Sequence, residues 1–382
     1  MKRGPCFLHI GVWLLCMETS ACLCLGGEPE AKPSGERKPS DLSRLRDARL
    51  NEQEGKPVSE RTRAEVEALI EKAGTTPPDW WDSVTLDYPP TLDLAWTNAP
   101  NQRGTNQNLN LYIWNVINVN PPRWKQGAKL LFHTLSVNKN DPGKLKQSMN
   151  ALAKIYHDLL QDYARAAYWW RKAGSTGCGN CPLGLADCYH RLGNKEMAVE
   201  VLQRFNQPLS MQAIRTWAEV GEHDKALQMA LDMTNKNAGP LKSLGFLIAG
   251  DVCRIAARYN EALGYYQKAL EGGNMPRART ALEAVKCFDA LDLKKVPDGN
   301  YKDGSQGYSS IVQVAVTVKA HVIEDVKIVD HHEKQYYGSL IETPERIIQK
   351  QGVKGVDVFS SATLTSEAII QASAKALANA SK

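Results

Sequence analysis

A hydroxyl-rich segment near the end of the chain is the clearest candidate for chemistry. It reads Asp357-Val-Phe-Ser-Ser-Ala-Thr-Leu-Thr-Ser366 and leads into an alanine-rich stretch with helical composition. Backbone N–H groups at a helix N-terminus have no partner within the helix, and the helix dipole favours an anion there. The small side chains of Ser360, Ser361 and Ala362 would let a phosphate approach that backbone. The segment predicts either a phosphate site or a simple hydroxyl-rich helix cap.

The second candidate is the pair Cys178-Gly-Asn-Cys181. Attachment of a c-type haem needs His directly after the second Cys, and Pro182 occupies that position. A zinc site of the usual kind needs a second ligand pair, and the sequence has no second Cys-x-x-Cys. A thiol–disulfide function would need a thioredoxin-like strand pattern around the pair, which is missing. We therefore favour a local disulfide or two small buried residues.

The region 296–382 that contains the hydroxyl-rich segment predicts a small α+β domain. Four valines at alternating positions indicate a strand with one buried face: Val312, Val314, Val316 and Val318. A second strand is expected over 322–330. Thr343 and Pro344 predict a helix start, with Thr as the cap and Pro in the first turn. The alanine-rich stretch 364–380 predicts a final helix.

The stretch from Pro297 to Ser381 resembles the FMN-binding domain of the flavin-carrying subunits of the sodium-pumping NADH:quinone oxidoreductase and the Rnf complex. The matching pieces occur in order along the chain. They include the glycine-tyrosine opening at Gly307-Tyr308 and the sequence His331-His-Glu333. The hydroxyl-rich segment resembles the family's Ser-Gly-Ala-Thr-x-Thr-Ser signature.

This resemblance implies FMN as the cofactor. In the family, a dedicated flavin transferase can join the Thr after Ala to the FMN phosphate as an ester. The corresponding residue here is Thr363, and Asp357 stands at the acidic position of the transferase's recognition pattern. The resemblance implies these cofactor-binding residues: Thr363, Asp357, Ser360, Ser361, Ala362, Thr365, Ser366, Gly307 and Tyr308. Ser361 departs from the family, since it replaces a Gly that adopts left-handed backbone at less cost.

The middle of the chain, 148–295, predicts an array of helical repeats that ends in a capping helix over 276–291. Four alanines in equivalent positions are separated by 32, 28 and 36 residues: Ala166, Ala198, Ala226 and Ala262. This spacing is close to the period of about 34 residues in tetratricopeptide repeats, which the array resembles. Small residues let two helices approach closely, and aromatic residues fill the adjacent space. We expect the array to dock a redox partner protein or a membrane complex.

Two further segments precede the array. Residues 79–147 are rich in Trp, Asn and Pro and predict an irregular segment followed by a first helix. We expect the aromatic side chains to pack the irregular segment onto a neighbouring domain. Residues 28–78 are polar with charges of both signs, which predicts a flexible linker. One helix is expected within the linker, over 59–73, with a narrow apolar face made by Val66, Leu69 and Ile70.

The first 27 residues have the pattern of an export signal peptide. Lys2 and Arg3 precede an apolar run over 7–17, and small residues follow it. This run has about half the length that spans a bilayer. Cys22 leaves attachment of a lipid as an alternative. We expect a protein of the periplasm or cell envelope, with membrane association as a further option.

Composition restricts the remaining function classes. The 382 residues include 47 Lys and Arg against 42 Asp and Glu, a net charge of +5. There is no basic stripe with interleaved aromatics, which argues against nucleic acid as a partner. No apolar run reaches the roughly 20 residues of a membrane-spanning helix, which excludes a polytopic membrane protein.

The sequence as a whole predicts a multidomain chain, an all-α tetratricopeptide-like solenoid followed by a small α+β FMN-binding domain. The leading hypothesis is an exported flavoprotein that carries FMN, covalently on Thr363, for electron transfer. It assigns no catalytic residues and no metal ligands to the chain. The alternative is an interaction scaffold whose FMN-binding-like domain is degenerate and carries no flavin.

Overall fold

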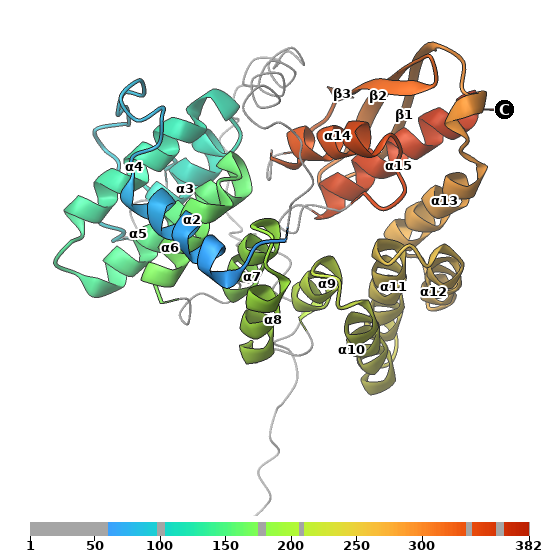
Figure 1. Cartoon of the computed structure of the whole chain (residues 1–382), viewed down its shortest axis with the longest axis horizontal. Coiled ribbons are helices and arrows are strands. Elements are labelled where there is room, and N and C mark those ends of the chain that lie inside the picture. Colours follow the sequence, from blue (N-terminus) through green and yellow to red (C-terminus); the bar gives the residue numbers. More distant parts are fainter. Residues whose placement is uncertain are drawn as a thin grey trace, which may run out of the picture. The chain divides into compact units, whose positions relative to one another are not determined.

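A computed structural model describes residues 60–97, 104–174, 181–205, 210–333, 338–356 and 363–381 (Figure 1). A helical region is followed by a three-stranded antiparallel sheet with two helices, which confirms the predicted fold class. The export signal, Cys178 and the segment 357–362 lie outside the described residues.

The helical region contains four helix pairs at the positions predicted for the repeats. Its elements are α2 (Arg63–Thr75), α3 (Leu109–Tyr112), η1 (Ile113–Ile117), η2 (Pro121–Arg123), α4 (Trp124–Val137), α5 (Pro142–Ile155), η3 (Tyr156–Leu160), α6 (Tyr163–Lys172), α7 (Cys181–Arg191), α8 (Lys195–Arg204), α9 (Met211–Glu219), α10 (His223–Lys236), α11 (Pro240–Ile255), α12 (Tyr259–Glu271), α13 (Pro276–Ala290) and η5 (Leu293–Lys295). The pairs are α5 with α6, α7 with α8, α9 with α10 and α11 with α12. Their assignment to tetratricopeptide repeats stays a prediction.

Small residues lie where the paired helices cross, as the spacing predicts. The four equivalent alanines are fully buried. At the last crossing, Gly250 of α11 lies against the ring of Tyr266 of α12, and a Cβ on Gly250 would approach that ring to 2.4 Å. The buried Tyr266 ring is fixed because its hydroxyl donates to Asp251 at 3.0 Å. Close approach of the helices therefore depends on glycine at this position.

The end of the predicted linker is packed rather than flexible. Helix α2 packs against α6 and buries Val66 and Ile70, which lie one turn apart. Leu69, expected on the same apolar face, is 37% exposed. The chain before α2 is also held, because the Arg61 N–H donates to the Gly193 carbonyl at 2.9 Å. Burial of these two aliphatic side chains stabilises the helix on the array.

The Trp-rich segment packs as predicted. Trp96 is buried, and its indole N–H donates to Ser148 Oγ at 2.8 Å. Trp124, at the start of α4, is also buried, and the Trp81 ring meets Phe132 edge to face at 4.9 Å. The first helix pair begins earlier than predicted, because α5 starts at Pro142 with Asp141 as its cap.

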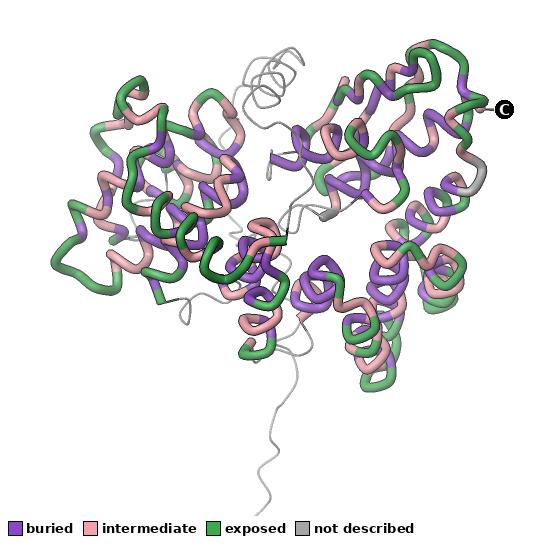
Figure 2. Tube along the Cα trace, viewed as in Figure 1, coloured by how far each residue is buried: buried purple, intermediate pink, exposed green. Residues whose placement is uncertain are grey.

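The C-terminal domain is a β1-β2-β3 sheet with α14 and α15 against it (Figure 1). Its elements are β1 (Gly299–Gln306), β2 (Ile311–Lys319), β3 (Val322–Asp330), α14 (Ser339–Lys350) and α15 (Thr363–Ala380). Helix α15 packs on β1 and β2, and α14 packs on β3 and on α15. All four alternating valines of β2 are buried, as predicted, and α15 is buried along most of its length (Figure 2).

Two elements of this domain differ from the sequence-based expectation. Strand β1 was not predicted, because its residues are mostly polar or Gly and only Ser305 is buried among them. Helix α14 begins at Ser339, so Thr343 is not its cap and Pro344 lies inside the helix. Burial of Leu340 and Ile341 explains the earlier start, since their packing outweighs the local Thr-Pro signal.

Cys181 is disulfide-bonded, which agrees with the preferred interpretation of the Cys-x-x-Cys pair. Cys188 and Cys253 are buried thiols in the array. Within the part of the chain that the structure describes, no helix has the length and apolar character needed to cross a membrane.

A buried charged group links the first two helix pairs. The ring of His157 lies between two carboxylates, with Nδ1 2.6 Å from Asp158 and Nε2 2.8 Å from Asp187. Burial alone would lower the pKa of His157, but hydrogen bonds and charges from both aspartates outweigh it and raise the pKa to about 9. Lys154 and Arg191 in turn face the two aspartates. His157 is therefore an imidazolium at neutral pH.

This histidine should make stability depend on pH. Its folded pKa of about 9 lies above the unfolded value of 6.5, so its contribution is complete below pH 6.5 and is lost as the pH rises to 9. The loss should reach roughly 3 kcal/mol in the free energy of unfolding. Urea denaturation across this pH range measures it. His157→Gln should flatten the profile, whereas His321→Gln, at an exposed position, should leave it as in the wild type.

Two glycine substitutions test the helix crossing. Gly250→Ala should destabilise the chain by about 1–3 kcal/mol, because its methyl group meets the fixed Tyr266 ring. The matched control is Gly264→Ala in α12, where a Cβ meets no atom within 4 Å. The control should stabilise the helix by up to about 1 kcal/mol. Thermal melts that shift in the same direction for both variants would contradict this packing.

Candidate functional site

Glu333, just after β3, joins two separate parts of the C-terminal domain. Its buried carboxylate accepts the backbone N–H groups of the turn between β1 and β2, from Tyr308 at 3.2 Å, Ser309 at 2.9 Å and Ser310 at 3.4 Å. It also accepts the hydroxyl hydrogen of Thr365, in the first turn of α15. One carboxylate thus holds the β1–β2 turn against the N-terminus of α15.

Gly307 makes room for this carboxylate. A Cβ at position 307 would lie 2.7 Å from Glu333 Oε1 and 2.8 Å from Val312 Cγ2. The Gly307 N–H donates to the Ser310 carbonyl at 2.7 Å and closes the turn. The glycine of the predicted Gly-Tyr opening is therefore required by close approach of Glu333.

The structure brings together four of the predicted site residues. Gly307 and Tyr308 meet Thr365 through Glu333, and Ser366 follows, fully buried, in α15. The Thr365 hydroxyl donates to Glu333, so Thr365 helps to position that carboxylate. The Tyr308 side chain is exposed.

The other predicted residues cluster around the start of α15. Thr363 is its first residue, two positions before Thr365. Asp357, Ser360, Ser361 and Ala362 lie outside the described residues. Glu333 was part of the matching sequence but was not predicted as a site residue. The signal available in the sequence was that Glu333 is an acidic residue between a predicted strand and a predicted helix.

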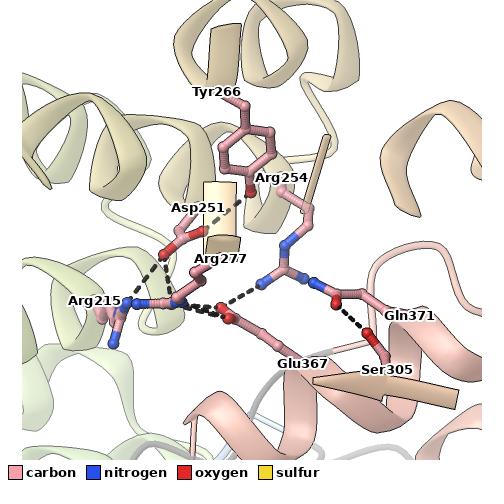
Figure 3. Close-up of polar contacts among 8 residues, drawn as sticks. All are labelled: Arg215, Asp251, Arg254, Tyr266, Arg277, Ser305, Glu367 and Gln371. Carbon is pink, nitrogen blue, oxygen red and sulfur yellow. Dashed lines mark hydrogen bonds and ion pairs between the residues drawn. The ribbon is translucent and has the colours of Figure 1, made fainter. Parts of the chain in front are cut away.

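A network of buried charges connects α15 to the array (Figure 3). Glu367 of α15 is held by Arg277 of α13 at 2.8 Å and by Arg254 of α11 at 3.4 Å. Arg277 also binds Asp251 at 2.9 Å, and Arg215 of α9 binds the same aspartate at 3.0 Å. Burial raises the pKa of Asp251, but the charges of Arg277 and Arg215 outweigh burial and lower it. The Asp251 carboxylate is therefore ionised at neutral pH.

Helix α14 is also connected to the array through a carboxylate. Glu342 accepts hydrogen bonds from Gln161 and from Arg346, and lies 3.6 Å from Arg191 of α7. Close by, a Cβ on Gly338 would approach the Asp158 carbonyl to 2.3 Å. Both helices that flank the segment 357–362 thus contact the array.

Comparison with known proteins identifies the domain. Residues 307–378 match the family model of the FMN-binding domain, which confirms the resemblance and indicates FMN as the cofactor. An uncharacterized protein of Treponema pallidum (strain Nichols) is 36% identical over 99 residues. That match covers 26% of this chain and 26% of the relative, so the chain spans about a quarter of the relative's length. The chain therefore contains an FMN-binding domain.

The described residues fit the phosphate end of FMN. Helix α15 starts at Thr363, and its first turn contains no acidic residue. The N–H groups of that turn are the kind of donors that bind phosphate. The Gly307 turn is held beside it through Glu333, which accepts hydrogen bonds from both the turn and Thr365. Thr363 and the first turn of α15 would hold the phosphate, and FMN would supply redox chemistry when bound.

The role of Glu333 can be tested by Glu333→Gln. The amide replaces one acceptor oxygen with a donor, so at least one buried N–H or hydroxyl loses its acceptor. We expect a loss of about 1–3 kcal/mol in urea denaturation and faster hydrogen exchange of the Tyr308 to Ser310 amides. Glu324→Gln is the control, because Glu324 is exposed and its ion pair with Lys319 is long, at 4.0 Å. Equal effects from both variants would rule out this role.

Proposed function

We propose that the chain is an exported flavoprotein that carries FMN covalently on Thr363 and uses it for electron transfer. One observation carries this proposal. Glu333 binds both the Gly307-Tyr308 turn and the first turn of α15, and all of these residues lie in the region that matches the FMN-binding domain. This arrangement supports a phosphate position at the helix N-terminus, where Thr363 stands.

Attachment at Thr363 follows from hydroxyl chemistry. The Thr363 hydroxyl oxygen would bond to the phosphorus of a flavin dinucleotide, whose pyrophosphate bond breaks. The nucleoside monophosphate leaves, together with the hydroxyl proton. A flavin transferase would supply the donor and align it. The product is an ester that keeps one negative charge on the phosphate.

A covalent flavin suits a protein that works outside the cytoplasm. A reversibly bound cofactor is lost by mass action where its free concentration is low. An ester prevents that loss, because the flavin stays at high effective concentration beside its site. The disulfide at Cys181 supports an oxidising compartment. Within this proposal the helical array docks a redox partner or a membrane complex.

One observation favours a second candidate. Ser361 stands where the family signature has Gly, and a residue with a Cβ pays more for left-handed backbone than Gly does. If the loop cannot adopt its family conformation, the domain would act as a flavin-free part of an interaction scaffold. Colour in the purified protein separates the two candidates.

The attachment site is tested with Thr363→Val. Wild-type chain made together with a flavin transferase should remain fluorescent on a denaturing gel, with a mass increased by one FMN less water. Thr363→Val removes the oxygen that forms the ester, so both signals should disappear. Thr363→Ser keeps a hydroxyl and should retain them.

The control is Thr365→Val, because Thr365 is the next hydroxyl residue after Thr363 in α15. It should lose stability because Glu333 loses a donor, yet it should keep the FMN mass at low temperature. Fluorescence that survives Thr363→Val would place the ester elsewhere. A colourless wild type made with the transferase would favour the scaffold.

A further inference from the structure

We propose that two arginines of the helical array, Arg254 and Arg277, neutralise Glu367 so that the first turn of α15 can hold the FMN phosphate. The inference rests on the proposed function, because that phosphate is the anion in question. It makes the array part of the flavin site, although both arginines lie outside the FMN-binding domain.

The first step is the position of Glu367. It follows Thr363 by four residues in α15, so the two positions are neighbours on one helix face. Four residues advance an α-helix by about 6 Å. Glu367 is only 5% exposed, and charges in such surroundings are weakly screened by water and salt. Without compensation, its carboxylate would oppose an anion bound one turn earlier.

The second step is how tightly the arginines hold this carboxylate. Arg277 Nη2 lies 3.0 Å from Oε1 and 2.8 Å from Oε2, and its Nε lies 3.1 Å from Oε2. Arg254 Nη2 adds a contact of 3.4 Å to Oε1. Both carboxylate oxygens therefore face a guanidinium group.

The third step is the support behind the arginines (Figure 3). Asp251 accepts from Arg277 Nη2 at 2.9 Å and from Arg215 at 3.0 Å, and the Tyr266 hydroxyl donates to it at 3.0 Å. On the other side, Gln371 accepts from the Ser305 hydroxyl at 2.8 Å, one turn beyond Glu367. A small pocket beside the contact is lined by Arg254, Phe288, Glu367 and Gln371. The charges are thus held in fixed positions.

A purely structural role and charge compensation predict different behaviour. If the ion pair only holds helices together, the bare Glu367 carboxylate should lower stability by the same amount with and without attached FMN. If the arginines compensate charge for the phosphate, the loss should be larger when FMN is attached, and removing the carboxylate should abolish that difference. Comparing each variant with and without FMN therefore separates the two roles.

The experiment compares full-length variants made with a flavin transferase. Arg254→Met with Arg277→Met should take up FMN on the order of ten-fold more slowly than wild type, because one buried charge now opposes the phosphate. Adding Glu367→Gln to that pair should restore the rate. Arg279→Met is the matched control, since Arg279 is an exposed arginine of the same helix that contacts Asn274, and it should load like wild type.

A second readout needs no flavin transfer rate. The melting temperature of each variant with FMN attached is compared with that of the same variant carrying Thr363→Val. Attached FMN should lower the melting temperature in the double Met variant and should not lower it once Glu367→Gln is added. If the double variant does not fold, Glu367→Gln alone decides, and it should load FMN at least as fast as wild type.

Two results overturn the inference. One is a double Met variant that folds and loads FMN at the wild-type rate. The other is Glu367→Gln that slows loading, alone or in the double variant, since this indicates a structural role. In both cases the wild type still carries FMN, so the proposed function stands. A wild type without FMN would instead refute the proposed function.

Discussion

The C-terminal domain depends on one buried carboxylate. Glu333 accepts from three backbone N–H groups and from one hydroxyl, so its negative charge is compensated by hydrogen bonds although no cation lies among these partners. A carboxylate can be buried without large cost only when such donors are present. The donors come from both ends of the domain. The turn after β1 and the start of α15 therefore cannot move apart without leaving the charge uncompensated.

The elements that sequence could predict are those whose signal is local. Alternating valines predict β2, and the alanine spacing predicts the helix pairs, because each pattern reports the face that is buried. Strand β1 lacks such a pattern, because its residues are mostly polar or Gly and it is held by hydrogen bonds to β2. Helix α14 starts before its Thr-Pro signal, because the buried pair Leu340 and Ile341 decides where the helix begins.

The same distinction applies to the site. Gly307, Tyr308 and Thr363 to Ser366 could be found as family motifs, since these residues are consecutive in sequence. The contacts of these residues with distant partners could not be predicted, although Glu333 itself lies in the matching sequence His331-His-Glu333. Glu333 meets Thr365 across 32 positions, and Arg277 meets Glu367 across 90. Such pairs form only when the chain has folded, and a single Arg or Glu in a helix looks like an ordinary solvated charge.

The distant pairs also change how the two parts of the chain should be understood. Glu367 of α15 finds its cations on helices of the array, Arg254 and Arg277. Glu342 of α14 pairs with Arg346 of its own helix and also lies 3.6 Å from Arg191 of the array. Removing one member of a buried ion pair leaves an uncompensated charge, which is more costly than never having buried it. The array and the FMN-binding domain are therefore energetically coupled at two separate helices. These two helices stand before and after the segment 357–362 in the sequence, so the array contacts the chain on both sides of that segment.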